Sequence, residues 1–142
     1  MTSTKEMLVK DVMTFGARCI GENDSLAAAA HLMAALDIGS LPICGENGKL
    51  KGMLTDRDIV VKAIANGRAA GSTTAGELAE GKPLMVDVED DIQQVLTIMQ
   101  EHRVRRVPVL DDRVLVGMVA EADIARTLDA QQTGETVEQI TR

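Results

Sequence analysis

The sequence predicts an α/β fold of the α+β type, built from two copies of one β-α-β-β-α unit. A shift of 66 residues places Leu41-Pro42-Ile43 on Val107-Pro108-Val109, and after the next turn a shift of 65 residues places Gly52-Met53 on Gly117-Met118. Within each copy, short apolar runs alternate with segments whose apolar residues recur at helical spacing. Strands and helices therefore follow the same order twice, which is the mark of an internal repeat.

Each copy contains an opening strand, a capped helix, a hairpin whose turn is rich in Gly, Asn or Asp, and a closing helix. In the first copy we expect a strand at 18–20, a helix from Asp24-Ser25, strands at 41–44 and 49–54, and a helix at 56–65. In the second copy we expect a strand at 84–88, a helix from Asp90-Asp91, strands at 107–110 and 114–119, and a helix at 121–128. Asp90 and Gln93 have the spacing of a capping box at the start of the helix.

The boundary between the copies is expected in a loop at 66–74, which is rich in Gly, Ala, Ser and Thr. The predicted domains are therefore residues 1–70 and 71–130, followed by a polar tail at 131–142.

The amino-acid composition argues against two classes of binding partner, membranes and nucleic acids. Hydrophobic residues make up 45% of the chain, yet no apolar run approaches the roughly 20 residues of a membrane span, and the polar N-terminus lacks a signal-peptide pattern. We therefore expect a cytoplasmic protein that does not bind membranes. A net charge of -7 and a single aromatic residue, Phe15, argue against nucleic-acid binding, because phosphates are repelled and bases find nothing to stack on.

The chain shows no pattern of catalytic residues. No nucleophile beside a base, convergent carboxylate pair or metal-ligand spacing is evident, so we expect neither an enzyme nor a metal site. A nucleotide hydrolase assembled from distant residues is the alternative, and phosphate release from ATP would reveal it.

The two cysteines, Cys19 and Cys44, lack CxxC spacing and are interpreted as small core residues. A disulfide between them is the alternative, since each lies in a short apolar run typical of a strand and neighbouring strands can bring such positions into bonding range.

The segment from Gly52 to Asp58 runs from a strand into a helix and has two interpretations. In the structural one, Thr55 caps the helix and Asp58 completes a capping-box-like pair. In the functional one, the helix N-terminus and the Thr55 hydroxyl attract a phosphate, Asp58 accepts hydrogen bonds from ribose hydroxyls, and Arg57 offers a guanidinium to the phosphate. Gly52 would allow the backbone to approach a ligand closely.

The doubled unit, its two apolar-Pro-apolar strands and the Gly-x-x-Thr-x-x-Asp motif resemble a pair of CBS domains, also called a Bateman module, over about residues 8 to 130. Four phrases resemble a stand-alone branch of this family linked to hypoxic stress: Leu-Pro-Ile-Cys-Gly, Gly-Met-Leu-Thr-Asp-Arg-Asp-Ile-Val, Thr-Ala-Gly-Glu-Leu-Ala and Val-Arg-Arg-Val-Pro-Val. The resemblance implies two units about a pseudo-twofold axis, with clefts for AMP, ADP, ATP or S-adenosylmethionine, and pairing of chains into flat homodimers through the helices.

The resemblance also implies which residues bind the ligand. Thr55 and Asp58 would serve the first cleft, and the backbone around Ile20, Gly21, Pro42 and Ile43 would contact the adenine edge.

The second copy departs from the family pattern, because Ala120 stands where the motif has a hydroxyl, although Asp123 is kept. If one nucleotide binds, we therefore expect it at Thr55 and Asp58, with Asp123 either a relic or a simple helix-start carboxylate. The basic cluster His102, Arg103, Arg105 and Arg106 suits the C-terminus of a helix. The alternative is that Arg105 or Arg106 reaches the phosphates of the nucleotide.

Taken together, these patterns favour a stand-alone regulatory module. It would sense an adenosine-containing ligand, require no cofactor, and act as a homodimer on an unknown effector protein in trans, in a stress or hypoxia response. The alternative is a ligand-independent dimer that serves as an interaction scaffold and has vestigial nucleotide sites.

Overall fold

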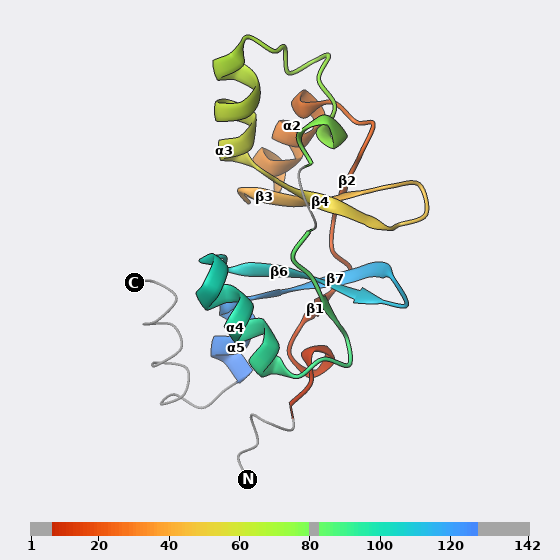
Figure 1. Cartoon of the computed structure of the whole chain (residues 1–142), viewed down its shortest axis with the longest axis vertical. Helices are drawn as coiled ribbons and strands as arrows, with labels where there is room; N and C mark the ends of the chain where they lie inside the picture. Colours follow the sequence, from red (N-terminus) through yellow and green to blue (C-terminus); the bar gives the residue numbers. More distant parts are fainter. Residues whose placement is uncertain (1–6, 80–82, 128–142) are drawn as a thin grey trace. The chain divides into compact units, whose positions relative to one another are not determined.

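The computed structural model describes residues 7–79 and 83–127, and confirms a mixed fold of helices and strands arranged in two compact units. The first unit comprises Arg18–Pro83 and the second unit the described parts of Met1–Ala17 and Leu84–Arg142. Each unit has a sheet with helices on one face (Figure 1).

The first unit contains a three-stranded sheet in the order β2-β3-β4, with β2 parallel and β4 antiparallel to β3. Its elements are β2 (Ile20–Gly21), α2 (Leu26–Leu36), β3 (Ser40–Cys44), β4 (Leu50–Thr55), α3 (Asp56–Asp58), a π turn at Ile59–Ala63, and 3-10 turns at Ile64–Asn66 and Ala75–Leu78.

Helix α2 forms where the sequence predicts it. The Ser25 side chain accepts a hydrogen bond from the backbone of Ala28 at 3.0 Å, and Asp37 ends the helix in the left-handed conformation at φ 55°. Leu26, Ala29 and Met33 on its inner face are buried against the sheet with Leu41, Ile43 and Leu54 of the strands.

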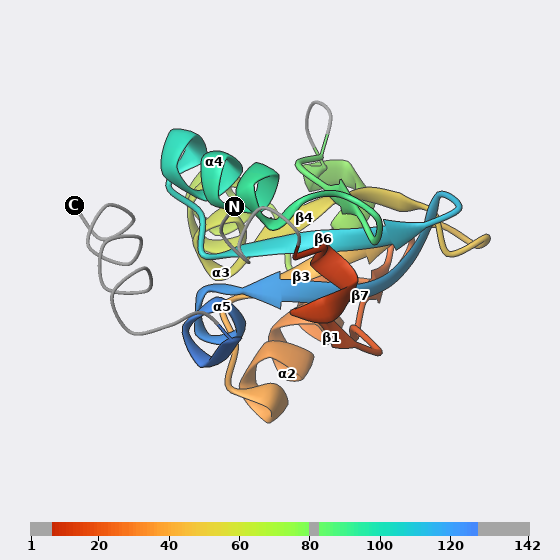
Figure 2. The same ribbon diagram turned by 90° about the horizontal axis from the view of Figure 1, so that it is seen from below.

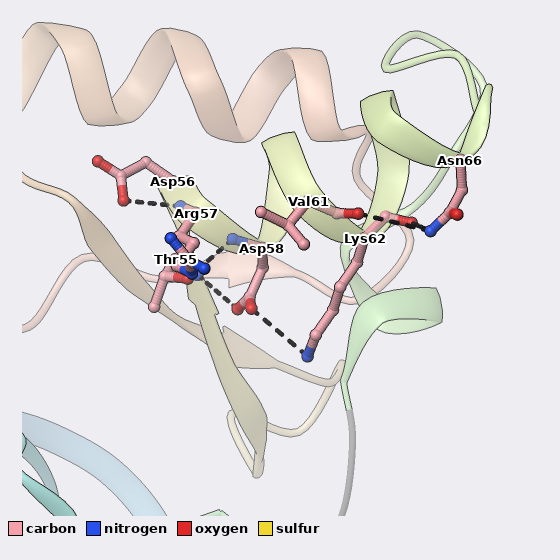
Figure 3. A network of polar contacts seen from close by, with 7 residues as sticks. All are labelled: Thr55, Asp56, Arg57, Asp58, Val61, Lys62 and Asn66. Atoms are coloured by element: carbon pink, nitrogen blue, oxygen red, sulfur yellow. Dashed lines mark hydrogen bonds and ion pairs between the residues drawn. The ribbon is translucent and has the colours of Figure 1, made fainter.

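The closing helix of the first unit is continuous over 56–66 but irregular. One α turn, α3, is followed by the π turn and a 3-10 turn, which ends at Gly67 with φ 76°. The Asn66 side chain donates to the carbonyl oxygens of Lys62 at 3.1 Å and Val61 at 3.4 Å, and so satisfies acceptors at the helix end (Figure 3).

The second unit contains a four-stranded sheet in the order β1-β7-β6-β5, and Figure 2 shows β1 beside β7. Its elements are a 3-10 turn at Val9–Asp11, β1 (Thr14–Phe15), β5 (Val86–Asp87), α4 (Ile92–His102), β6 (Arg106–Asp111), β7 (Val114–Ala120) and α5 (Glu121–Thr127).

Strand β1 was not expected from the sequence. It pairs antiparallel with β7, placing Thr14 on Met118 and Phe15 on Gly117, while Val9, Val12 and Met13 are buried in the core of the second unit. The compact units therefore differ from the expected ranges 1–70 and 71–130, because the N-terminal segment packs with the second copy.

One further detail differs from the sequence-based expectations. The N-cap of α4 is Asp91, which forms its capping box with Gln94, whereas the Asp90 carboxylate accepts from the backbone of Asp87 at 2.8 Å. The expected capping pair of Asp90 and Gln93 was therefore wrong by one residue. The loop at 66–74 is also bound to its unit, since Leu26 donates to the carbonyl of Thr73 at 2.8 Å.

The expected tail at 131–142 lies outside the described residues. Within the described ranges, no helix combines the length and apolar character that crossing a membrane requires.

Candidate functional site

Thr55 and Asp58 form a reciprocal pair where β4 ends and α3 begins. The backbone N–H of Asp58 donates to Thr55 Oγ1 at 3.0 Å, and the backbone N–H of Thr55 donates to Asp58 Oδ2 at 3.0 Å (Figure 3). This confirms the capping-box prediction. A hydroxyl has both a donor and acceptor positions, so Thr55 Oγ1 keeps its proton for a further hydrogen bond while it accepts from Asp58.

The second oxygen of Asp58 faces a cation. Lys62 Nζ lies 3.4 Å from Asp58 Oδ1, one helical turn away, and both side chains are partly exposed, at 39% for the lysine and 21% for the aspartate. Arg57 is exposed beside this pair, and its backbone N–H donates to Asp56 Oδ1 at 2.7 Å. The Asp58 carboxylate therefore accepts from the Thr55 N–H and faces the Lys62 ammonium, and the exposed Arg57 precedes it in the chain.

The residues expected to form a wall around the ligand base lie together in the sheet of the first unit. Ile20 pairs with Ile43 and Gly21 with Cys44 across β2 and β3, and Pro42 is the neighbour of Ile43. The side chains of Ile20, Pro42 and Ile43 are buried, and the Gly21 N–H donates to the Asp24 carboxylate at 2.9 Å. A ligand in contact with this wall would therefore meet backbone atoms.

Gly52 has a packing role. A Cβ atom placed on Gly52 would lie 3.2 Å from the Cβ of Ala79 and 3.9 Å from Cδ1 of Ile43. The glycine thus permits the segment around Ala79 to lie against β4, a role that needs no ligand.

Asp123 of the second unit occupies the position equivalent to Asp58 but is only 5% exposed. Its Oδ2 accepts from the backbone N–H of Ala120 at 2.8 Å, and its Oδ1 accepts from the Thr14 hydroxyl at 3.1 Å and from Arg126. The Thr14 hydroxyl of β1 donates to the carboxylate of Asp123, whereas the Thr55 hydroxyl accepts from the backbone N–H of Asp58, so the two hydroxyls have different roles.

The basic cluster lies in the second unit. His102 occupies the last turn of α4 and Arg103 is its C-cap at φ 54°, which agrees with the interpretation of cations at a helix C-terminus. Arg105 Nε lies 3.5 Å from Glu121 Oε2, and Arg106 is the exposed first residue of β6. The position of Arg105 and Arg106 relative to Thr55 and Asp58 stays a prediction.

The two cysteines are neighbours but differ in environment. Cys44 is buried, whereas Cys19 is exposed and precedes β2, so the core interpretation holds for Cys44 and was wrong for Cys19. Both are free thiols. Burial and a hydrogen bond with Cys19 raise the pKa of Cys44 to about 12. A disulfide between them stays a prediction.

Sequence reasoning missed two contacts of the candidate aspartates. Lys62 stands four residues after Asp58, a spacing that identifies a neighbour on one helix face, so this signal was available. Thr14 lies 109 residues before Asp123, and no local pattern connects them.

The chain is similar to known proteins along most of its length. The model of the CBS domain matches residues 9–64 and 75–130. Hypoxic response protein 1 of Mycobacterium tuberculosis is 53% identical over 119 residues, which cover 84% of this chain and 83% of that protein.

Two solved structures extend the comparison. A crystal structure of Hypoxic Response Protein I with two coordinated zinc ions has a TM-score of 0.81 at 51% identity, and the match covers 87% of this chain and 100% of that one. Within residues 7–79 and 83–127 of the present chain, no group of three or more His, Cys, Asp or Glu side chains is placed to hold a metal ion. CBSX2, solved in complex with AMP, has the same fold, with a TM-score of 0.72 at 23% identity over 95% of this chain and 98% of that one. The two matched segments, the internal repeat and the 53% identical relative show that this chain belongs to the CBS-domain family and contains two CBS domains.

Proposed function

We propose that this protein is a non-enzymatic regulatory module that senses an adenosine-containing ligand at Thr55 and Asp58. The ligand class comprises AMP, ADP, ATP and S-adenosylmethionine. In this proposal the protein acts as a homodimer on an effector protein in trans. The 53% identical relative is named a hypoxic response protein, which supports a role in a stress or hypoxia response.

The observation that carries the proposal is the contrast between the two equivalent aspartates. The Asp58 side chain is 21% exposed and has one oxygen directed at Lys62, whereas the Asp123 side chain is 7% exposed and accepts from three groups of its own unit. A ribose has two neighbouring hydroxyls that can donate to an accessible carboxylate. The Asp58 carboxylate can take such a ligand with less loss of existing hydrogen bonds.

The groups around Asp58 also suit a phosphate. The Thr55 hydroxyl, the Lys62 ammonium and the Arg57 guanidinium are all donors, and two of them carry positive charge. The arrangement therefore has an acceptor for the sugar and donors for the phosphate within one short stretch of chain, from Thr55 to Lys62.

Calorimetric titration with the four ligands tests the proposal. The wild type should bind one ligand per chain, and Asp58→Ala should weaken binding by about 10- to 100-fold, because hydrogen bonds to a charged group contribute about 1.5–3 kcal/mol. Asp58→Asn serves as a second variant that keeps an acceptor for the Thr55 N–H but loses the charge.

Asp123→Ala, checked by circular dichroism to be folded, is the matched control and should leave the affinity unchanged. Loss of binding in Asp123→Ala, with retention in Asp58→Ala, would move the site to the second unit.

A scaffold without a ligand is the second candidate function. It is favoured by the burial of Asp123, because the second copy has no accessible carboxylate at this position. If the wild type binds none of the four ligands, the scaffold becomes the better explanation.

A further inference from the structure

The thiols of Cys19 and Cys44 lie against each other at one end of the parallel strands β2 and β3. Cys19 directly precedes β2, Cys44 is the last residue of β3, and a hydrogen bond joins the two side chains. Cys19 is exposed, whereas Cys44 is only 4% exposed, so an oxidant in solution reaches Cys19 first. An accessible cysteine with a second thiol beside it is the usual arrangement of a redox-sensing pair.

The thiol pair belongs to only one of the two repeats, because the chain has two cysteines and both lie in the first unit. A shift of 66 residues places Met85 at the position of Cys19. The same shift places Leu110 at the position of Cys44, and Leu110 pairs with β5 as Cys44 pairs with β2. The strand pairing is therefore common to both units, while the redox chemistry is confined to the unit that carries the candidate ligand site.

Strand β3 is held more firmly than β2. It is the central strand of its sheet, with β2 on one side and β4 on the other, whereas β2 has two residues and lies at the edge. A disulfide bond is about 2.05 Å long, which is shorter than any hydrogen-bonded contact between two sulfur atoms. Because Cys44 is buried on the central strand, Cys19 and the backbone of β2 make the adjustment when the bond forms.

The backbone of β2 is also part of the wall expected to contact the base of the ligand. Ile20 and Gly21 follow Cys19 directly, and Gly21 pairs with Cys44 in the register of the two strands. The Ile20 side chain is buried, so the backbone atoms of β2 are the groups that a ligand would meet. Hydrogen bonds weaken steeply when distance and angle change, so a shift of this strand alters the contacts with the base.

We propose that oxidation of Cys19 and Cys44 to a disulfide weakens the binding of the adenosine-containing ligand at the first unit. This inference rests on the proposed function and adds a regulation of the same site. Hydrogen peroxide is an oxidant of the required class: the Cys19 sulfur attacks one oxygen, the O–O bond breaks, and a sulfenic acid and one water form. The Cys44 sulfur then displaces a second water and forms the S–S bond. Two thiol protons and two electrons thus pass to the peroxide.

The coupling also acts in the opposite direction. If the disulfide lowers the affinity for the ligand, bound ligand opposes formation of the disulfide by the same factor, because coupling between two sites is reciprocal. The rate of ligand-free oxidation by diamide therefore gives the reference against which protection by a ligand is measured.

Calorimetry of the reduced and the oxidised protein tests the proposal. Wild type treated with diamide, with the intramolecular disulfide verified by mass spectrometry, is titrated with AMP, ADP, ATP and S-adenosylmethionine. It should bind about three- to tenfold more weakly than wild type kept in a phosphine reductant, which is the effect of losing one neutral hydrogen bond. Addition of the reductant should restore the affinity.

Cys19→Ser is the matched control, because residue 19 is exposed and serine has nearly the same size. This variant should keep the affinity of the reduced wild type before and after diamide. Equal affinity of reduced and oxidised wild type, or an equal loss in Cys19→Ser, overturns the redox control and leaves the ligand site standing. A wild type that binds none of the four ligands in either state instead overturns the proposed function, and the redox control with it.

Hydrogen exchange measures the shift of β2 without any ligand. The backbone N–H of Glu22, directly after β2, donates to the carbonyl oxygen of Cys44 at 3.0 Å. Oxidation should speed its exchange and leave the exchange of β4 unchanged, because β4 lies on the far side of the central strand. Unchanged exchange at Glu22 in the oxidised protein would show that β2 does not move and would overturn the proposed coupling.

Discussion

Asp58 and Asp123 occupy the same position in the repeat, yet the neighbours of each side chain give it a different role. Asp123 is held by the N–H of Ala120, by the hydroxyl of Thr14 and by Arg126, and it is nearly inaccessible to water. The Asp58 side chain is partly exposed, and one of its oxygens faces Lys62. In the second unit the aspartate therefore holds the structure together through hydrogen bonds. In the first unit the equivalent aspartate is a candidate group for ligand binding.

This difference predicts unequal effects on stability. Asp123→Ala should lower the free energy of unfolding by about 1–3 kcal/mol, because it removes the charged acceptor of three donors, the Ala120 N–H, the Thr14 hydroxyl and Arg126. Asp58→Ala should cost about 1 kcal/mol, the usual cost of losing a cap. Urea unfolding of both variants measures the difference, with Thr14→Val as a control that removes one of the donors to Asp123. Equal losses in the two aspartate variants would contradict the structural role of Asp123.

The thiols of Cys19 and Cys44 should differ in reactivity. The pKa of Cys44 is raised from 9.0 to about 12, so its reactive thiolate is scarce at pH 8, while Cys19 is exposed. Iodoacetamide followed by peptide mass mapping should therefore find Cys19 alkylated first. Since the raised pKa favours the protonated thiol in the folded state, the stability from Cys44 is complete below pH 9 and is lost as the pH rises toward 12.

Oxidation of the Cys19 and Cys44 thiols would test the predicted disulfide. Cys44 shares a hydrogen bond with Cys19, so the two sulfurs are neighbours before any bond forms. A bond between them would close a loop of about 25 residues and raise the free energy of unfolding by about 3 kcal/mol on the chain-entropy model. Continued alkylation of both cysteines after treatment with diamide would rule the bond out.

At the scale of elements, the contact between β1 and β7 depends on a glycine. A Cβ on Gly117 would lie 2.3 Å from the carbonyl oxygen of Thr14 and 2.4 Å from Cε of Met13, whereas a Cβ on Gly52, its equivalent, would meet Ala79 at 3.2 Å. The close approach of β1 to the sheet therefore requires the absence of a side chain at 117.

Gly117→Ala should separate β1 from β7 and lower the free energy of unfolding by about 2–3 kcal/mol, at the upper end of the usual cost of overpacking. The matched variant Gly52→Ala should cost less, because a contact of 3.2 Å can be relieved by a small shift of Ala79. Thermal unfolding of the two variants compares them directly, and an equal loss would argue against the tight β1 contact.

At the scale of the whole molecule, the two compact units do not follow the order of the chain. The second unit takes its first strand and part of its core, including Val9, Val12 and Met13, from the N-terminus, and the first unit is inserted between this segment and the rest. The two units therefore depend differently on the N-terminal segment.

Removal of residues 1–17 should destabilise the second unit and leave the core of the first intact. Hydrogen exchange followed by mass spectrometry should show faster exchange in β6 and β7 and unchanged protection in β3 and β4. Faster exchange confined to β3 and β4 would contradict the packing of the N-terminal segment.

The sequence by itself determined the features that depend on residues close together in the chain. Its repeat predicted two units with the same order of strands and helices, and the spacing of Thr55 and Asp58 predicted the reciprocal cap that the structure contains. Even the contact between Asp58 and Lys62 follows from helix geometry. These features depend on residues a few positions apart, whose relation the helix or hairpin sets.

Only the tertiary structure decided the rest. The pairing of β1 with β7, the hydrogen bond from Thr14 to Asp123 and the exposure of Cys19 all depend on segments that meet after folding. Strand pairing across a hundred residues leaves no periodic trace in the sequence, because backbone groups form its hydrogen bonds and these are the same for every residue. For this reason the sequence identified both aspartates and favoured Asp58 because of Ala120, whereas the burial of Asp123 became visible only in the fold.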